Sequence, residues 1–211
     1  MKTINLILLA LVAIYLLAAP LALGQGGNPP ASTKESKATS GHGKTAVEQT
    51  YVAAENDSKA IFAKHWRVAK EFTLAVAEAM PPEGYDFKPN PEEAAFGQLM
   101  IHIAAQNSDS CATAAGTKPL AELDSSLAAW PPAVFDKQTA IKLLTLAFDK
   151  CAHDIDAMPP EQWNKEVYKF QGQPVLASEA LWYTFTHMAH HRGQAEVYLR
   201  VKNIKPPAWR F

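Results

Sequence analysis

The chain has 211 residues, of which 48% are hydrophobic, enough for one folded domain with a buried core. Its 20 basic and 21 acidic residues are interspersed and give a formal net charge of -1, without a basic stripe on any predicted helix. This excludes the electrostatic footprint of a nucleic-acid-binding protein, so we expect one domain and no nucleic-acid partner.

The first 24 residues predict an export signal. Lys2 precedes a nearly unbroken apolar run over residues 4–23, which ends in small residues just before Gln25. This pattern is typical of a cleaved signal peptide, so we expect residues 1–24 to be removed and the mature protein to be exported, either periplasmic or secreted. Because the run is about 20 residues long, an uncleaved signal that anchors the chain in a membrane is the alternative.

Residues 25–57 predict a flexible tether, and residues 58–211 the folded domain. The tether is rich in Gly, Ser, Thr, Lys and Ala and has almost no large apolar side chain before Tyr51. Such a segment buries too little surface to offset the entropy lost on ordering.

The domain contains four stretches with the apolar spacing of long helices, which are residues 58–80, 90–115, 137–158 and 178–202. Asn90 and Pro91 are predicted to cap the second helix and to form its first turn. Residues 167–176 predict a short hairpin or an extended loop before the last helix. Four amphipathic helices predict an all-α fold, a helical bundle, and the connection of about twenty residues after the second helix is long enough to cross the bundle.

The chain has two cysteines, Cys111 and Cys151. An oxidising compartment permits a disulfide between them, but the sequence does not give the distance between their Cα atoms. We interpret them as two buried, reduced side chains, with a disulfide as the alternative.

Three histidines fall within five positions of the predicted last helix: His187, His190 and His191. His187 and His191 lie one turn apart on one helical face, so both imidazoles can reach one metal ion. His190 lies about 100° around the helix from His191, and we predict that it lies at the pocket edge or on the surface. This spacing alone is a weak signal, because histidines also occur at i and i+4 by chance.

His102 lies in the apolar first half of the predicted second helix. It is either a buried neutral imidazole that bonds to a neighbour or, opposite the histidine pair, the third ligand of a metal. Three imidazoles with one open position are typical of a catalytic site, and they suit zinc, nickel, iron or copper. Candidate partners for the ligands are four nearby polar side chains: Gln98, Gln106, Tyr183 and Tyr198.

Two motifs resemble the DinB/YfiT-like superfamily: FGQLMIHIA at residues 96–104 and HMAHHRGQ at residues 187–194. The similarity covers about residues 58–207. It implies a four-helix bundle of up-down-down-up topology and a divalent metal ion, Zn, Ni or Fe, held by His102, His187 and His191. Activities in the family are diverse, and members resemble thiol-dependent S-transferases or isomerases, or metal-dependent hydrolases.

These observations predict an exported, metal-dependent enzyme of the hydrolase type that acts on a small-molecule substrate through metal-activated water. One alternative is a thiol-dependent S-transferase or isomerase, although low-molecular-weight thiols are chiefly cytoplasmic. The other is a non-catalytic metal- or ligand-binding stress protein, because Asp109 is the nearest candidate for a general base and can equally be a solvated residue. A homodimer through exposed bundle faces is a further expectation.

Overall fold

The computed structural model describes residues 46–123 and 136–211, with side chains from residue 58 onward. The predicted signal peptide and residues 25–45 of the predicted tether lie outside this range. Within the described ranges, no helix combines the length and the apolar content needed to span a membrane.

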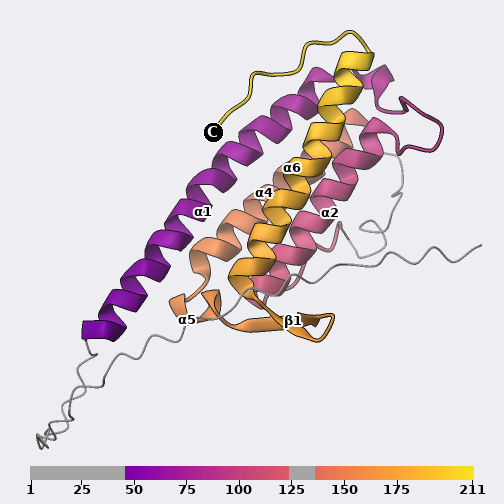
Figure 1. Cartoon of the computed structure of the whole chain (residues 1–211). Helices are drawn as coiled ribbons and strands as arrows, with labels where there is room; N and C mark the ends of the chain where they lie inside the picture. The colour runs from indigo at the N-terminus through magenta and orange to yellow at the C-terminus, as the bar shows by residue number, and fades with distance from the viewer. Residues whose placement is uncertain (1–45, 124–135) are drawn as a thin grey trace, which may run out of the picture. The chain divides into compact units, whose positions relative to one another are not determined.

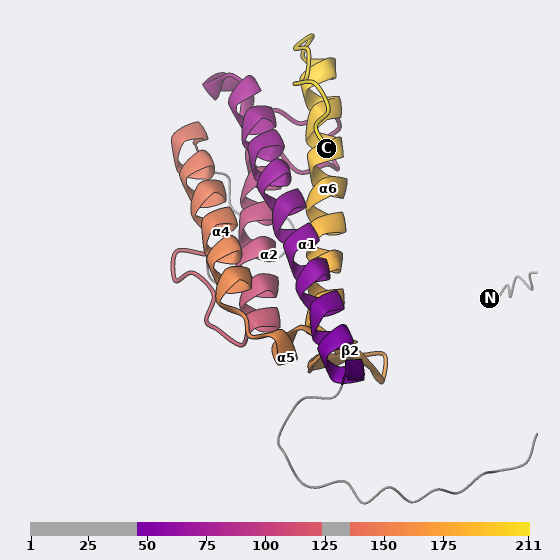
Figure 2. The ribbon, with the colours of Figure 1, turned by 90° about the vertical axis from the view of Figure 1, so that its left-hand side faces the viewer.

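Four long helices form the bundle (Figure 1), and they are α1 (Ala46–Ala79), α2 (Phe96–Ala115), α4 (Lys137–Ala157) and α6 (Ala177–Val201). Helices α1 and α6 run in one direction, and α2 and α4 run in the other (Figures 1 and 2). The all-α fold and the up-down-down-up topology are therefore as predicted. Helix α2 packs against both α4 and α6, and most of its residues are buried.

Helix α1 begins at Ala46, twelve residues before the predicted start of the domain at Ser58. The added segment, residues 46–57, lacks an apolar stripe, and for that reason the sequence indicated a tether. It is nevertheless rich in Ala, Glu and Gln, which favour the helical backbone without any packing.

Helix α2 begins at Phe96 with Ala95 as its N-cap, so the prediction of a cap at Asn90 is wrong. The Asn90 side chain instead accepts a hydrogen bond from the backbone amide of Glu92 at 3.1 Å, which closes a local turn. The amide of Phe96 donates to the carbonyl of Phe87 at 3.0 Å. Asn90 therefore shapes the connection between α1 and α2, which also contains the short helix η1 (Pro82–Gly84).

Cys111 of α2 and Cys151 of α4 form a disulfide, with their Cα atoms 5.3 Å apart. The interpretation of two reduced thiols is therefore corrected. The crossover makes α2 and α4 parallel neighbours, and this brings together two residues that are 40 positions apart in the sequence. Both cysteines lie in the core.

The predicted hairpin is present at the end of the bundle where α6 begins (Figure 1). After the short helix α5 (Pro160–Trp163), strands β1 (Glu166–Phe170) and β2 (Gln173–Leu176) pair in antiparallel fashion. The turn between them places Gln171 and Gly172 at positive φ, of 50° and 80°. The hairpin leads directly into α6 and contacts it through β2.

Candidate metal centre

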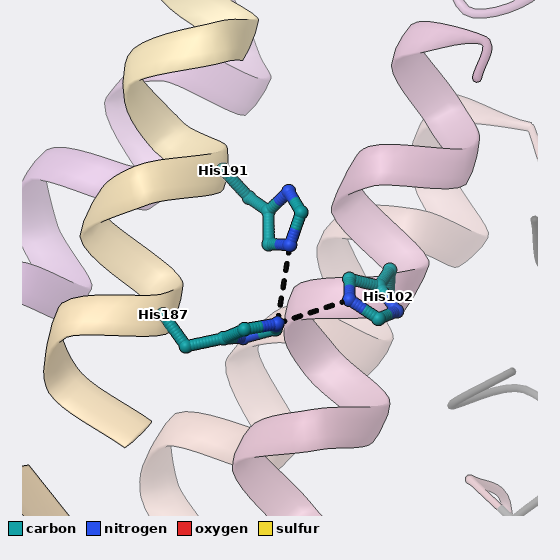
Figure 3. Close-up of side chains that lie close together, drawn as sticks. All are labelled: His102, His187 and His191. Atoms are coloured by element: carbon teal, nitrogen blue, oxygen red, sulfur yellow. Dashed lines mark hydrogen bonds between the residues drawn. The ribbon is translucent and has the colours of Figure 1, made fainter. Parts of the chain in front are cut away.

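The three histidines predicted to bind a metal come together between α2 and α6 (Figure 3). His102 projects from α2, and His187 and His191 project from successive turns of α6. The Nε2 atom of His187 lies 3.2 Å from that of His102 and 3.1 Å from that of His191. Each ring directs one nitrogen toward the same point, and these nitrogens lie within 4.8 Å of one another.

These separations match the spacing of ligands around one metal ion. Two imidazole nitrogens that lie about 2.1 Å from a zinc ion at tetrahedral angles are about 3.4 Å apart. A proton between two rings can satisfy only one nitrogen pair, whereas a cation can accept a lone pair from all three. The residues therefore fit a divalent metal.

Burial keeps the rings of His187 and His191 in the state that binds metal. Desolvation, reinforced by the nearby His191, His102 and His190, lowers the pKa of His187 from its ordinary value of 6.5 to about 4. Desolvation also lowers the pKa of His191, although its bond to Gln194 opposes this shift. A neutral imidazole carries a lone pair, so both rings can act as ligands at neutral pH.

Gln194 orients His191, a role that was not predicted from the sequence. The Nδ1 atom of His191 lies 2.7 Å from Oε1 of Gln194, and a glutamine oxygen only accepts. The His191 Nδ1–H therefore donates to Gln194, which leaves the Nε2 lone pair directed at the other two rings. The spacing of three residues on one helix is the signal that could have identified this pair.

Three of the four side chains that the sequence suggested as partners for the ligands form hydrogen bonds to other groups. Gln98 accepts a hydrogen bond from the backbone amide of Ala95 at 2.8 Å and thereby caps α2. Gln106 donates to Oγ of Ser110 at 2.9 Å. Tyr198 donates its hydroxyl to the carbonyl of Ala94 at 2.9 Å, which ties α6 to the start of α2.

Tyr183 contacts the centre, because its ring stacks on His187 with centroids 5.9 Å apart. His190 is exposed and lies beside the ring of His191, outside the converging trio. We refer to His102, His187 and His191 together as the triad.

A groove lies between α2, α6 and the hairpin. Two adjoining pockets, of about 390 and 330 Å³, share Tyr168 of β1 and Tyr183 of α6 as walls. Toward the hairpin the groove is mainly apolar, and toward α2 it is polar and contains Gln106, Asp109 and Ser110. Gln106 and Tyr183 each lie one helical turn from a triad histidine, so the groove approaches the site that a metal would occupy. We call it the hairpin groove.

Comparisons with known proteins agree with this architecture. The sequence model of the DinB superfamily matches residues 65–195, which is more than half of the chain. A DinB-like protein from Bacillus cereus is similar in structure, with a TM-score of 0.59 and 19% identity over 71% of this chain and 95% of the other. A DinB-like protein from Bacillus subtilis gives 0.55 and 19%, over 70% and 95%. At this identity the likeness shows the fold alone, and no curated protein matches the chain.

Proposed function

The chain belongs to the DinB superfamily, and we propose that it is an exported, metal-dependent enzyme that hydrolyses a small-molecule substrate at the triad. The observation that supports this most directly is the convergence of three imidazole nitrogens at 3.1 and 3.2 Å. No further His, Cys, Asp or Glu joins this cluster among the described residues, so the protein leaves a coordination position for water or substrate.

A divalent ion held by three imidazoles lowers the pKa of a water molecule and polarises a carbonyl or phosphoryl oxygen. The protein contributes the orientation of the ligands. Gln194 holds His191 in the tautomer that directs Nε2 inward, and Tyr183 packs on the face of His187. Burial maintains His187 as a neutral ligand.

The hairpin groove is where we expect the substrate to lie. Tyr168 and Tyr183 provide aromatic surface, and Asp109 provides a carboxylate on the opposite wall. Asp109 is exposed in this groove and is the candidate general base.

Export is supported by the signal-like N-terminus and by the disulfide between Cys111 and Cys151. Stable structural disulfides form mainly in oxidising compartments. Thiol cosubstrates are chiefly cytoplasmic, and for this reason we favour hydrolysis over transfer to a thiol. Fractionation of expressing cells tests the location. A protein that remains in the cytoplasm would contradict export and would remove the reason to favour hydrolysis over transfer to a thiol.

Elemental analysis of the purified protein tests the metal site. We expect about one equivalent of divalent metal in the wild type, and a loss of that metal in His102→Ala and in His191→Ala. His190→Ala is the matched control, because it removes an adjacent imidazole that lies outside the triad. Full metal content in His102→Ala would overturn the assignment.

Hydrolysis is tested with a panel of chromogenic carboxylic and phosphate esters. Turnover should disappear on chelation and return with added zinc, nickel or iron(II). Asp109→Asn separates catalysis from binding, because it should retain the metal while turnover falls by about 10²-fold or more if Asp109 is the base. Stoichiometric metal without any turnover across the panel, or turnover that requires a thiol, would contradict the hydrolase proposal.

A further inference from the structure

Arg192 follows His191 in the sequence motif but faces a different part of the protein. Its guanidinium carbon lies 4.3 Å from the ring centroid of Phe72, on α1. Because successive residues on a helix point about 100° apart, His191 faces α2 while Arg192 faces α1. The proposed metal chemistry therefore does not account for Arg192.

The guanidinium of Arg192 is partly buried and forms no salt bridge among the described residues, although the charge of Glu196 acts on it. Its Nε is buried and has no hydrogen-bond partner, and Nη1 contacts only the sulfur of Met188 at 3.5 Å. The nearest acidic residue on its own helix, Glu196, pairs with Arg200 at 3.7 Å. A buried cation that is not paired costs free energy, and the contact with Phe72 offsets only part of it.

A cavity of about 240 Å³ opens beside Arg192. Its walls combine cationic or titratable groups with aromatic rings, and they include His65, Phe185, Trp209, Arg210 and Phe211. We call it the tail pocket, because the C-terminal residues form one of its walls.

The C-terminal tail runs back from the end of α6 along α1 (Figures 1 and 2). Two contacts hold it there: the ring of Phe211 lies 4.7 Å from that of His65, and Arg210 pairs with Glu71 at 3.1 Å. The second contact pairs Glu71, the neighbour of Phe72 on α1, with Arg210. The stacked rings of Trp209 and Phe211 are 71% and 78% exposed, so apolar surface lies uncovered beside a buried cation.

We propose that the tail pocket binds a small aromatic carboxylate. The carboxylate would accept hydrogen bonds from the guanidinium of Arg192, whose planar set of donors matches a carboxylate in geometry and charge. The ring of the ligand would lie against Trp209 and Phe211 and cover their exposed faces. A cavity of about 240 Å³ has room for a single ring. This site is separate from the triad and stands independently of the proposed hydrolysis.

Calorimetric titration with phenylacetate tests the proposal. The full mature chain is used after chelation, because a carboxylate could otherwise bind a metal at the triad. We expect one equivalent to bind, and the uncharged analogue 2-phenylethanol to bind at least about tenfold more weakly. The zinc-loaded protein should retain this binding. If phenylacetate binds only when zinc is present, the ligand is at the triad and the proposal is wrong.

Arg192→Gln should weaken binding of phenylacetate about ten- to hundredfold, because it removes the charge and leaves a polar side chain. Arg67→Gln is the matched control, since Arg67 is exposed on α1 and does not line the tail pocket. It should bind as the wild type does. Equal binding by Arg192→Gln and wild type would overturn the proposal.

Trp209→Ala provides a second test that does not disturb the core, because Trp209 is exposed. It should weaken binding of phenylacetate and leave the metal content unchanged. If acetate binds wild type as tightly as phenylacetate does, and Trp209→Ala has no effect, the pocket is a simple anion site and the aromatic class is wrong.

Discussion

Burial lowers the pKa of a side chain on each of two faces of α6, but the resulting charge differs. On one face, burial lowers the pKa of His187 to about 4, so the ring is neutral and offers a lone pair to a cation. On the other face, burial also lowers the pKa of Arg192. Because the ordinary pKa of arginine is far above neutral pH, the side chain remains charged and can bind an anion. The same physical cause, desolvation, therefore produces a site for a metal on one face and a site for a carboxylate on the other.

The largest effect that we expect comes from removing His187, the middle ligand of the triad. His187→Ala deletes the nitrogen that lies within 3.2 Å of both other ligands, so stoichiometric zinc should be lost. Inductively coupled plasma mass spectrometry of the dialysed protein measures this. Arg192→Gln, on the opposite face, should retain the metal, and loss in both variants would show that the two faces are not independent.

A smaller effect on the same face should follow from removing the residue that orients a ligand. Gln194→Ala frees the His191 ring and should lower zinc affinity by about 10- to 100-fold, as competition with a chromophoric chelator measures. Gln106→Ala is the matched control, because Gln106 lies one turn from His102 and bonds to Ser110 instead. Equal losses in both variants would mean that Gln194 has no specific role.

The pH dependence of the metal-free protein should distinguish the faces. The pKa of His187 is lower in the folded state, about 4, than its ordinary value of 6.5, so the unfolded chain binds more protons between these values. The stability associated with neutral His187 is complete above pH 6.5 and is lost as pH falls toward 4. Thermal melts of wild type and His187→Gln should therefore converge over this window, and parallel profiles would contradict the assignment.

The smallest effect should be on the free energy of unfolding, when Arg192 is replaced by an apolar side chain. Arg192→Met removes an unpaired, partly buried charge but also its contact with Phe72. These contributions oppose each other, so the free energy of unfolding should change by no more than about 1 kcal/mol. Chemical denaturation measures this. A loss of several kcal/mol would show that Arg192 is a structural residue with a partner, and would weaken the case for a ligand.

Local signals in the sequence were sufficient for much of the fold. Apolar spacing located α4 and α6 to within a residue or two, and the turn-forming residues located the hairpin. Local signals misled where two of them competed. Asparagine is a good helix cap, but the side chain of Asn90 accepts a hydrogen bond within a local turn, from the amide of Glu92. Helix α2 therefore begins only at Phe96.

The candidate metal centre was predictable in part for the same reason. The spacing of His187 and His191 is a property of one helix, so geometry alone put both on one face. Gln194 has the same kind of local relation to His191 and could have been found in this way. His102 was different, because its assignment as a ligand required either the resemblance of this chain to a known family or knowledge of which helix faces α6.

By itself, the sequence determined the helices, the hairpin and the paired histidines, because each depends on residues within a few turns of one another. Only the tertiary structure decided which distant residues meet. The crossover that makes α2 parallel to α4 and antiparallel to α6 joined Cys111 to Cys151 and brought His102 to the other two ligands. The return of the tail along α1 similarly enclosed Arg192. Contacts of this kind depend on how whole helices pack, which no local pattern of residues specifies.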